Sequence, residues 1–184
     1  MPKDNLAILP RASSLPAWLH AELRSDHAGE TGAVWLYLGL LKFSRDPEVI
    51  AFAQVHLETE RAHLDFFEAW LKKEDKSMLI PLWRLAGGIL GAIAAFGGRN
   101  MVFVTVSAVE NFVVRHYDAQ IKALEQHHLH PEISQLLKTF NADEDMHRRD
   151  AEDRIDLNEP PASRLWRVLI TKGSDLSVKA AKRI

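Results

Sequence analysis

Two segments of the sequence place a glutamate and a histidine three residues apart within an otherwise apolar stripe. They are Glu60 with His63 in HLETERAHLDFF, and Glu144 with His147 in FNADEDMHRRDAE. Residues three apart in a helix lie on the same face, so each pair can direct a carboxylate and an imidazole toward one point. Carboxylates and imidazoles bind metal ions such as iron, manganese and zinc. The two pairs therefore predict a metal site.

A lone glutamate precedes each pair by about 30 residues, which forms a weak internal repeat and predicts two similar helix hairpins. One Glu from each of two helices, with Glu-x-x-His from each of the other two, is the ligand set of ferritin-like di-metal carboxylate proteins. Four buried carboxylates would each cost several kcal/mol without compensation, whereas two divalent cations neutralise them. This oxygen-rich set suits iron or manganese better than copper, and we expect iron. The six expected ligands are Glu30, Glu60, His63, Glu110, Glu144 and His147.

A third Glu-x-x-His pair, Glu125 with His128, does not fit this set. It lies roughly 22–27 Å along the helix axis from Glu110 and off the same face. It also falls in an HHLHP segment, where histidines suit a helix C-terminus. We expect no metal role for this pair.

The elements that must position these side chains are helices. No segment alternates apolar and polar residues with turn residues at its ends, so strands are not expected and the class is all-α. Apolar residues recur at i, i+3, i+4 and i+7, which places each ligand on a core-facing stripe. Prolines such as Pro47, after the N-cap candidate Asp46, mark helix starts. The expected helices cover residues 16–43, 47–73, 101–128, 131–155 and 161–181.

The chain of 184 residues is expected to form a single domain, residues 1–184. Its predicted architecture is a ferritin-like four-helix bundle with an apolar Gly-rich insert at 78–98 and an extra C-terminal helix. Its longest uncharged run, Leu85–Gly98, is shorter than the about 20 residues that span a bilayer. Trp83 and Arg84 beside apolar residues fit an interfacial helix on a membrane surface. A buried cap over the bundle, or a patch for a partner protein, is the alternative.

Composition excludes several other classes. A net charge of −2 gives no electrostatic reason to expect nucleic acid as a partner. The absence of cysteine excludes disulfides, cysteine-based zinc sites and thiol catalysis. The first 18 residues resemble neither a signal peptide nor a transit peptide. We therefore expect a protein that is made where it works, or one that has already lost a leader.

Five segments resemble, in this order, the demethoxyubiquinone hydroxylase family: LRSDHAGETGA, ETERAHL, PLWRLAGGILGA, VSAVENFVVRHYDAQI and FNADEDMHRRDAE. These proteins are membrane-associated di-iron monooxygenases of ubiquinone biosynthesis, and the resemblance covers about residues 20–182. It differs at Thr31, where an aromatic residue is frequent, and in EDMHRRD, where relatives often have a double histidine.

The resemblance implies the same six ligands, two iron ions per chain and hydroxylation of a demethoxyubiquinol ring by O2. It further implies a polyprenyl quinone substrate, and electrons from NADH or from the quinol itself. The expected location is peripheral, on the cytoplasmic face of a bacterial inner membrane or the matrix face of the mitochondrial one. Whether an accessory lipid-binding protein takes part stays open.

Several other residues are candidates for supporting roles. Gly29 and Gly32 flank Glu30, where each glycine costs about 1 kcal/mol relative to alanine. They indicate either room for a substrate or close helix packing. Asp143 either orients a metal-bound histidine or is an exposed acid.

His116 and Tyr117 are shared with the family. Tyr117 falls two turns beyond Glu110, about 10 Å along the helix. It is either a substrate gate or electron relay, or a core tyrosine with a hydrogen-bonded hydroxyl.

Two other functions compete with the hydroxylase hypothesis. One is a ferritin-like ferroxidase or iron-handling protein, which has no need of the apolar insert. The other is a metal-free helical scaffold that binds a partner through that insert.

Overall fold

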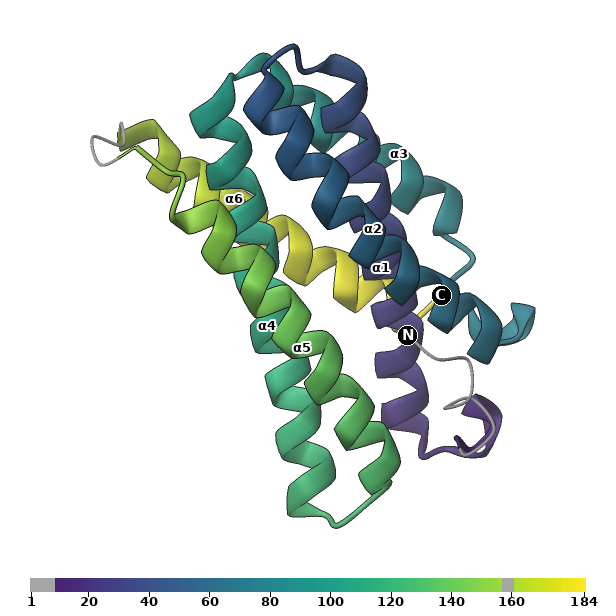
Figure 1. The fold of residues 1–184 in the computed structure, drawn as a ribbon. Coiled ribbons are helices and arrows are strands. Elements are labelled where there is room, and N and C mark those ends of the chain that lie inside the picture. The colour runs from purple at the N-terminus through teal and green to yellow at the C-terminus, as the bar shows by residue number, and fades with distance from the viewer. Residues whose placement is uncertain (1–8, 157–160) are drawn as a thin grey trace.

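The computed structural model describes residues 9–156 and 161–184. Over these residues the protein is helical, with six α-helices and no strand (Figure 1). The helices are α1 (Ala17–Phe43), α2 (Pro47–Trp70), α3 (Ile80–Phe96), α4 (Arg99–Gln126), α5 (Pro131–Glu152) and α6 (Pro161–Ala181). The predicted all-α class is confirmed. The expectation about the start of the chain lies partly outside the described residues.

Local backbone features determine where individual helices begin and end. The side chain of Asp46 accepts hydrogen bonds from the N–H groups of Glu48 and Val49, which confirms it as the N-cap of α2. Helix α2 ends at Trp70, before the expected residue 73, because Leu71 is extended. Helix α4 begins at Arg99, two residues earlier than expected. The residue before it, Gly98, has a φ of 86°, which glycine adopts at little cost.

Two helix hairpins make up the bundle. In Figure 1, α1 and α2 form one hairpin, and α4 and α5 form the other. Helix α3 packs along α1, and α6 contacts both α4 and α1. The four helices that carry the expected ligands are thus the four of the bundle, while α3 and α6 pack against them from outside.

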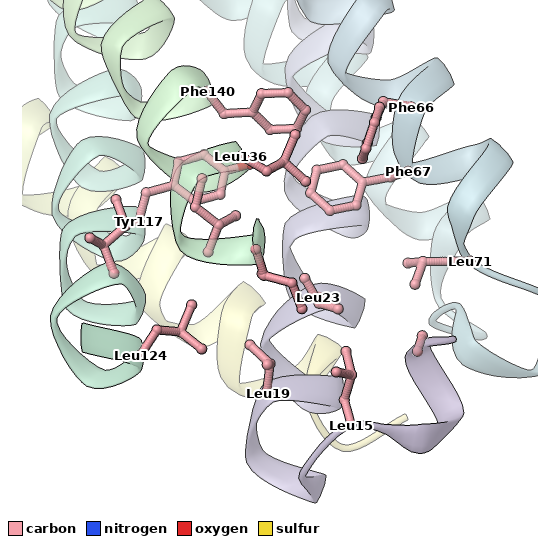
Figure 2. Close-up of a cluster of buried hydrophobic side chains, with 14 residues drawn as sticks. Leu15, Leu19, Leu23, Phe66, Phe67, Leu71, Tyr117, Leu124, Leu136 and Phe140 are labelled. Carbon is pink, nitrogen blue, oxygen red and sulfur yellow. The ribbon is translucent and has the colours of Figure 1, made fainter. Parts of the chain in front are cut away.

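The core is divided into two hydrophobic clusters. The first is built from the beginnings of α1 and α5 and the ends of α2 and α4, and includes Leu23, Phe67, Tyr117 and Phe140 (Figure 2). The second is built from the opposite ends of the same helices, with contributions from α3. On each bundle helix the expected glutamate falls in sequence between residues of the two clusters. Polar side chains therefore form a layer between two apolar ones.

Helices α1 and α3 approach each other through glycine. A Cβ atom added to Gly87 would lie 2.2 Å from the carbonyl oxygen of Gly32, and one added to Gly91 would lie 2.2 Å from that of Leu36. Real side chains do not tolerate such distances to a backbone atom. The backbone of Gly32 therefore packs closely against α3. Close helix packing was one of the two interpretations of this glycine.

We expect Gly91→Ala to lower the free energy of unfolding by about 1–3 kcal/mol, because the added methyl group would force α3 away from α1. Denaturant unfolding followed by circular dichroism would measure the change. Gly173→Ala in α6 is the matched control, since its added Cβ meets no atom within 4 Å. Equal stability of the two variants would show that the α1–α3 contact does not depend on glycine.

Candidate metal centre

All six sequence-predicted ligands meet in the polar layer, and each is at most 3% exposed. Their potential ligand atoms form two groups, within each of which all atoms lie within 4.8 Å of one another. The first group is Glu30, Glu60, His63 and Glu144. The second group is Glu60, Glu110, Glu144 and His147.

Glu60 and Glu144 belong to both groups, whereas Glu30 and Glu110 each belong to one. A carboxylate has two oxygens, so a shared glutamate can bridge two metal ions. Each Glu-x-x-His pair also contributes its histidine to only one group. The geometry thus provides two adjacent positions, each with one histidine, one unshared glutamate and two shared glutamates.

The imidazoles approach the carboxylates through their Nδ1 atoms. His63 Nδ1 lies 2.9 Å from Glu144 Oε1 and 3.7 Å from Glu30 Oε2. His147 Nδ1 lies 2.9 Å from Glu60 Oε1. Neither atom of this last contact has a hydrogen-bond partner in the described part of the chain. The two atoms are therefore close together without being hydrogen-bonded.

Buried polar atoms without partners are rare in folded proteins, and each needs a physical explanation. Within the described residues, both carboxylate oxygens of Glu60, Oε2 of Glu110 and both ring nitrogens of His147 have no hydrogen-bond partner. Cations between these atoms would satisfy most of them. The donor set, with four carboxylates and two imidazoles, fits iron.

Several side chains of the cluster have raised pKa values. Burial and neighbouring carboxylates raise the pKa of Glu60 to about 8 and that of Glu110 well above its ordinary value. Burial alone lowers the pKa of a histidine, but the surrounding carboxylates outweigh it. They raise the pKa of His63, and they raise that of His147 to about 11.

Both tyrosines of the chain donate hydrogen bonds to the cluster. The hydroxyl of Tyr117 lies 2.5 Å from Glu30 Oε1, and that of Tyr37 lies 3.0 Å from Glu110 Oε1. Tyr117 is therefore closer to the ligands than its two-turn spacing from Glu110 implies. The sequence analysis did not single out Tyr37. A usable signal existed, because Tyr37 follows Glu30 by seven residues, as Tyr117 follows Glu110.

The two histidine positions have different groups behind them. Asp143 Oδ2 lies 3.1 Å from His63 Nε2, the ring nitrogen that faces away from the cluster. The ring of His147 packs against that of His56, with centroids 4.2 Å apart. His56 in turn lies 2.9 Å from Asp150. Sequence reasoning selected Asp143 but missed the His56–Asp150 pair.

The Glu125–His128 pair lies far from these residues in the structure. Both side chains are exposed, and Glu125 forms an ion pair with Lys138. Neither belongs to a potential metal-binding group among the described residues.

A cavity of about 340 Å³ borders the cluster on its carboxylate side. All four glutamates line it, whereas neither His63 nor His147 is among the described residues of its wall. Gly29 and Gly32 also line it, so the space beside Glu30 is open there. The remaining wall is mostly apolar and comes largely from α3, α4 and α6.

His116 lies in the wall of this cavity, away from the six ligands. Its Nε2 atom is 3.2 Å from Oδ1 of the buried Asp26, which also accepts a hydrogen bond from Gln120. Burial lowers the pKa of His116, but the hydrogen bond and the charge of Asp26 outweigh this and raise it. His116 and Asp26 thus give an otherwise apolar cavity one polar wall.

A helical bundle with four glutamates and two histidines buried at its centre defines the ferritin-like class of di-metal carboxylate proteins. Within this class, the sequence pattern described as "Ubiquinone biosynthesis protein COQ7" matches residues 17–181. The chain belongs to this family, which confirms the resemblance seen in the sequence.

Individual relatives agree with this assignment. The chain is 31% identical over 165 residues to "NADPH-dependent 3-demethoxyubiquinone 3-hydroxylase, mitochondrial" of Rattus norvegicus, covering 88% of this chain and 76% of the relative. The protein of the same name from Homo sapiens is 30% identical over 166 residues, with the same coverage. "3-demethoxyubiquinol 3-hydroxylase" of Rhodospirillum rubrum is 29% identical over 179 residues, covering 96% and 83%.

We expect metal uptake at pH 7 to release up to four protons per chain. The pKa values of Glu60, Glu110, His63 and His147 are all raised, which favours their protonated forms, and ligands must lose their protons to bind metal. The apparent metal affinity therefore rises with pH. Calorimetric titration in two buffers of different ionisation enthalpy would count the protons, and uptake without proton release would contradict this picture of the cluster.

Proposed function

We propose that this protein hydroxylates the ring of a demethoxyubiquinol intermediate with O2 in ubiquinone biosynthesis, at a centre of two iron ions. The observation that carries the proposal is the convergence of the six predicted ligands into two groups that share two glutamates. Membership of the COQ7 family supports it, as do relatives that are named 3-demethoxyubiquinol or 3-demethoxyubiquinone 3-hydroxylases.

The reaction replaces a ring C–H bond with C–OH. It consumes O2, two electrons and two protons, and the second oxygen atom leaves as water. Bound iron ions would supply the redox change that O2 activation requires. Because relatives are named NADPH-dependent, we propose a reduced nicotinamide as the electron source, with the quinol itself as the alternative.

The chain's own residues hold the site in place and keep it dry. Asp143 fixes the ring orientation of His63 from behind, as carboxylates do for metal-binding histidines. The cavity presents the glutamates to a substrate from the side opposite the histidines. Its apolar wall suits a quinone ring and excludes water, while His116 and Asp26 offer a polar edge to ring oxygens.

The shape and lining of the cavity distinguish this function from its main alternative. A ferroxidase must admit hydrated iron ions, which need a polar path. Here the space beside the glutamates is mostly apolar, and residues of α3 and α6 line it. An organic substrate fits this lining better.

The exposed faces of α3 and α6 support attachment to a membrane surface. Their exposed apolar residues include Leu85, Ile89 and Phe96 of α3 and Leu165 and Leu176 of α6. Both helices also line the cavity, so a polyprenyl chain could pass from the bilayer to the glutamates. No described helix is both long and apolar enough to cross a membrane. We therefore propose peripheral binding, on the bacterial cytoplasmic or the mitochondrial matrix side.

Removal of a single ligand should lower the iron content and abolish hydroxylation. We expect Glu110→Ala and His147→Ala to retain at most one iron per chain and to lose activity by more than about 100-fold. Elemental analysis and a quinone turnover assay would measure both. Glu125→Ala is the matched control and should behave as the wild type. Full hydroxylation by either ligand variant would overturn the assignment.

Replacing apolar residues on the exposed face of α3 with charged ones should weaken membrane binding. We expect the double variant Leu85→Glu/Ile89→Glu to float poorly with liposomes, because each apolar side chain contributes about 1.5–3 kcal/mol when buried. Val55→Glu changes an exposed apolar residue on α2 and serves as the control. Equal flotation of the wild type and the double variant would refute the α3 surface as the membrane contact.

A further inference from the structure

The chain contains two tyrosines, and both lie at the metal centre. Each hydroxyl donates to one of the two unshared glutamates, Tyr37 to Glu110 and Tyr117 to Glu30. The hydrogen bonds cross between the hairpins, because each tyrosine follows one unshared glutamate by seven residues and binds the other one. Both rings are at most 1% exposed.

The two hydrogen bonds leave a defined oxygen of each glutamate for the cluster. In Glu110, Oε1 accepts from Tyr37, while Oε2 has no hydrogen-bond partner within the described residues. In Glu30, Oε1 accepts from Tyr117, while Oε2 faces His63 Nδ1 at 3.7 Å. Glu60 differs, because neither of its oxygens has a hydrogen-bond partner in the described chain.

We propose that Tyr37 and Tyr117 are a crossed pair of positioning residues that hold Glu110 and Glu30 as terminal ligands through one oxygen each. Tyr37 acts on the metal position of Glu110 and His147, and Tyr117 acts on that of Glu30 and His63. This inference rests on the proposed metal centre. Because the tyrosine occupies one carboxylate oxygen, the other oxygen of the same glutamate would be the one left to hold a metal ion.

The surroundings of the tyrosines favour a positioning role. Each ring belongs to one of the two hydrophobic clusters, Tyr117 to the first and Tyr37 to the second, where phenylalanine would pack equally well. Only the hydroxyl reaches the polar layer. Hydrogen bonds from a hydroxyl to a carboxylate are among the stronger ones in proteins.

The test combines Tyr→Phe substitutions with removal of one metal position at a time, in the full chain. His147→Ala leaves the position of Glu30 and His63. In this background we expect Tyr117→Phe to weaken Co(II) affinity about 10–100-fold, and Tyr37→Phe to leave it unchanged. In the His63→Ala background the two effects should exchange. Chelator competition measures affinity, and the intensity of the Co(II) visible bands reports any change in coordination number.

The outcomes separate this inference from the proposed centre. Two Co(II) ions bound by the wild type, with unchanged affinity in both tyrosine variants, would overturn the inference alone. Equal weakening by both variants in both backgrounds would also overturn it, since it would indicate a general structural role. Fewer than two ions bound by the wild type would overturn the proposed centre as well. Thermal unfolding of the apo variants identifies a loss of folding.

Discussion

The structure depends on the burial of four carboxylates at one level of a helical bundle. An ionised carboxylate in a dry interior costs roughly several kcal/mol, and like charges nearby increase that cost. The raised pKa values of Glu60, Glu110 and the two histidines favour bound protons, which reduce the negative charge. Two divalent cations would reduce it more completely. The hydrophobic clusters on both sides keep water out, so neutralisation has to occur within the cluster itself.

Helix α1 connects the buried carboxylates to the wall of the cavity. One face of this helix carries Glu30 into the polar layer, and another carries glycines against α3. Because the backbones of α1 and α3 nearly touch, α3 is held close to the glutamates and forms part of the cavity wall. An insert with bulky residues at these positions would lie farther away and leave the carboxylates open to solvent. The glycines therefore serve the centre as well as the fold.

The sequence allowed the ligands to be predicted because their information is local. A three-residue spacing sets a common helix face, and the ligand order repeats once along the chain. Contacts between hairpins are different in kind. Tyr37 and Glu110 are 73 residues apart, and whether they meet depends on how the hairpins are rotated against each other. Helix periodicity does not encode that rotation. Helix periodicity also does not predict that α2 ends before Leu71 or that α4 begins directly after Gly98. For this reason both helix boundaries differ from the expected ones.

The internal repeat is not exact, and its departure makes the two metal positions unequal. Asp143, one residue before Glu144, supports His63 from behind, whereas the residue before Glu60 is Thr59, which carries no charge. Accordingly, Nε2 of His147 has no hydrogen-bond partner among the described residues. A carboxylate behind a histidine makes it a more basic ligand. The position of His63 should therefore bind a cation more firmly than that of His147, although Glu60 and Glu144 belong to both groups.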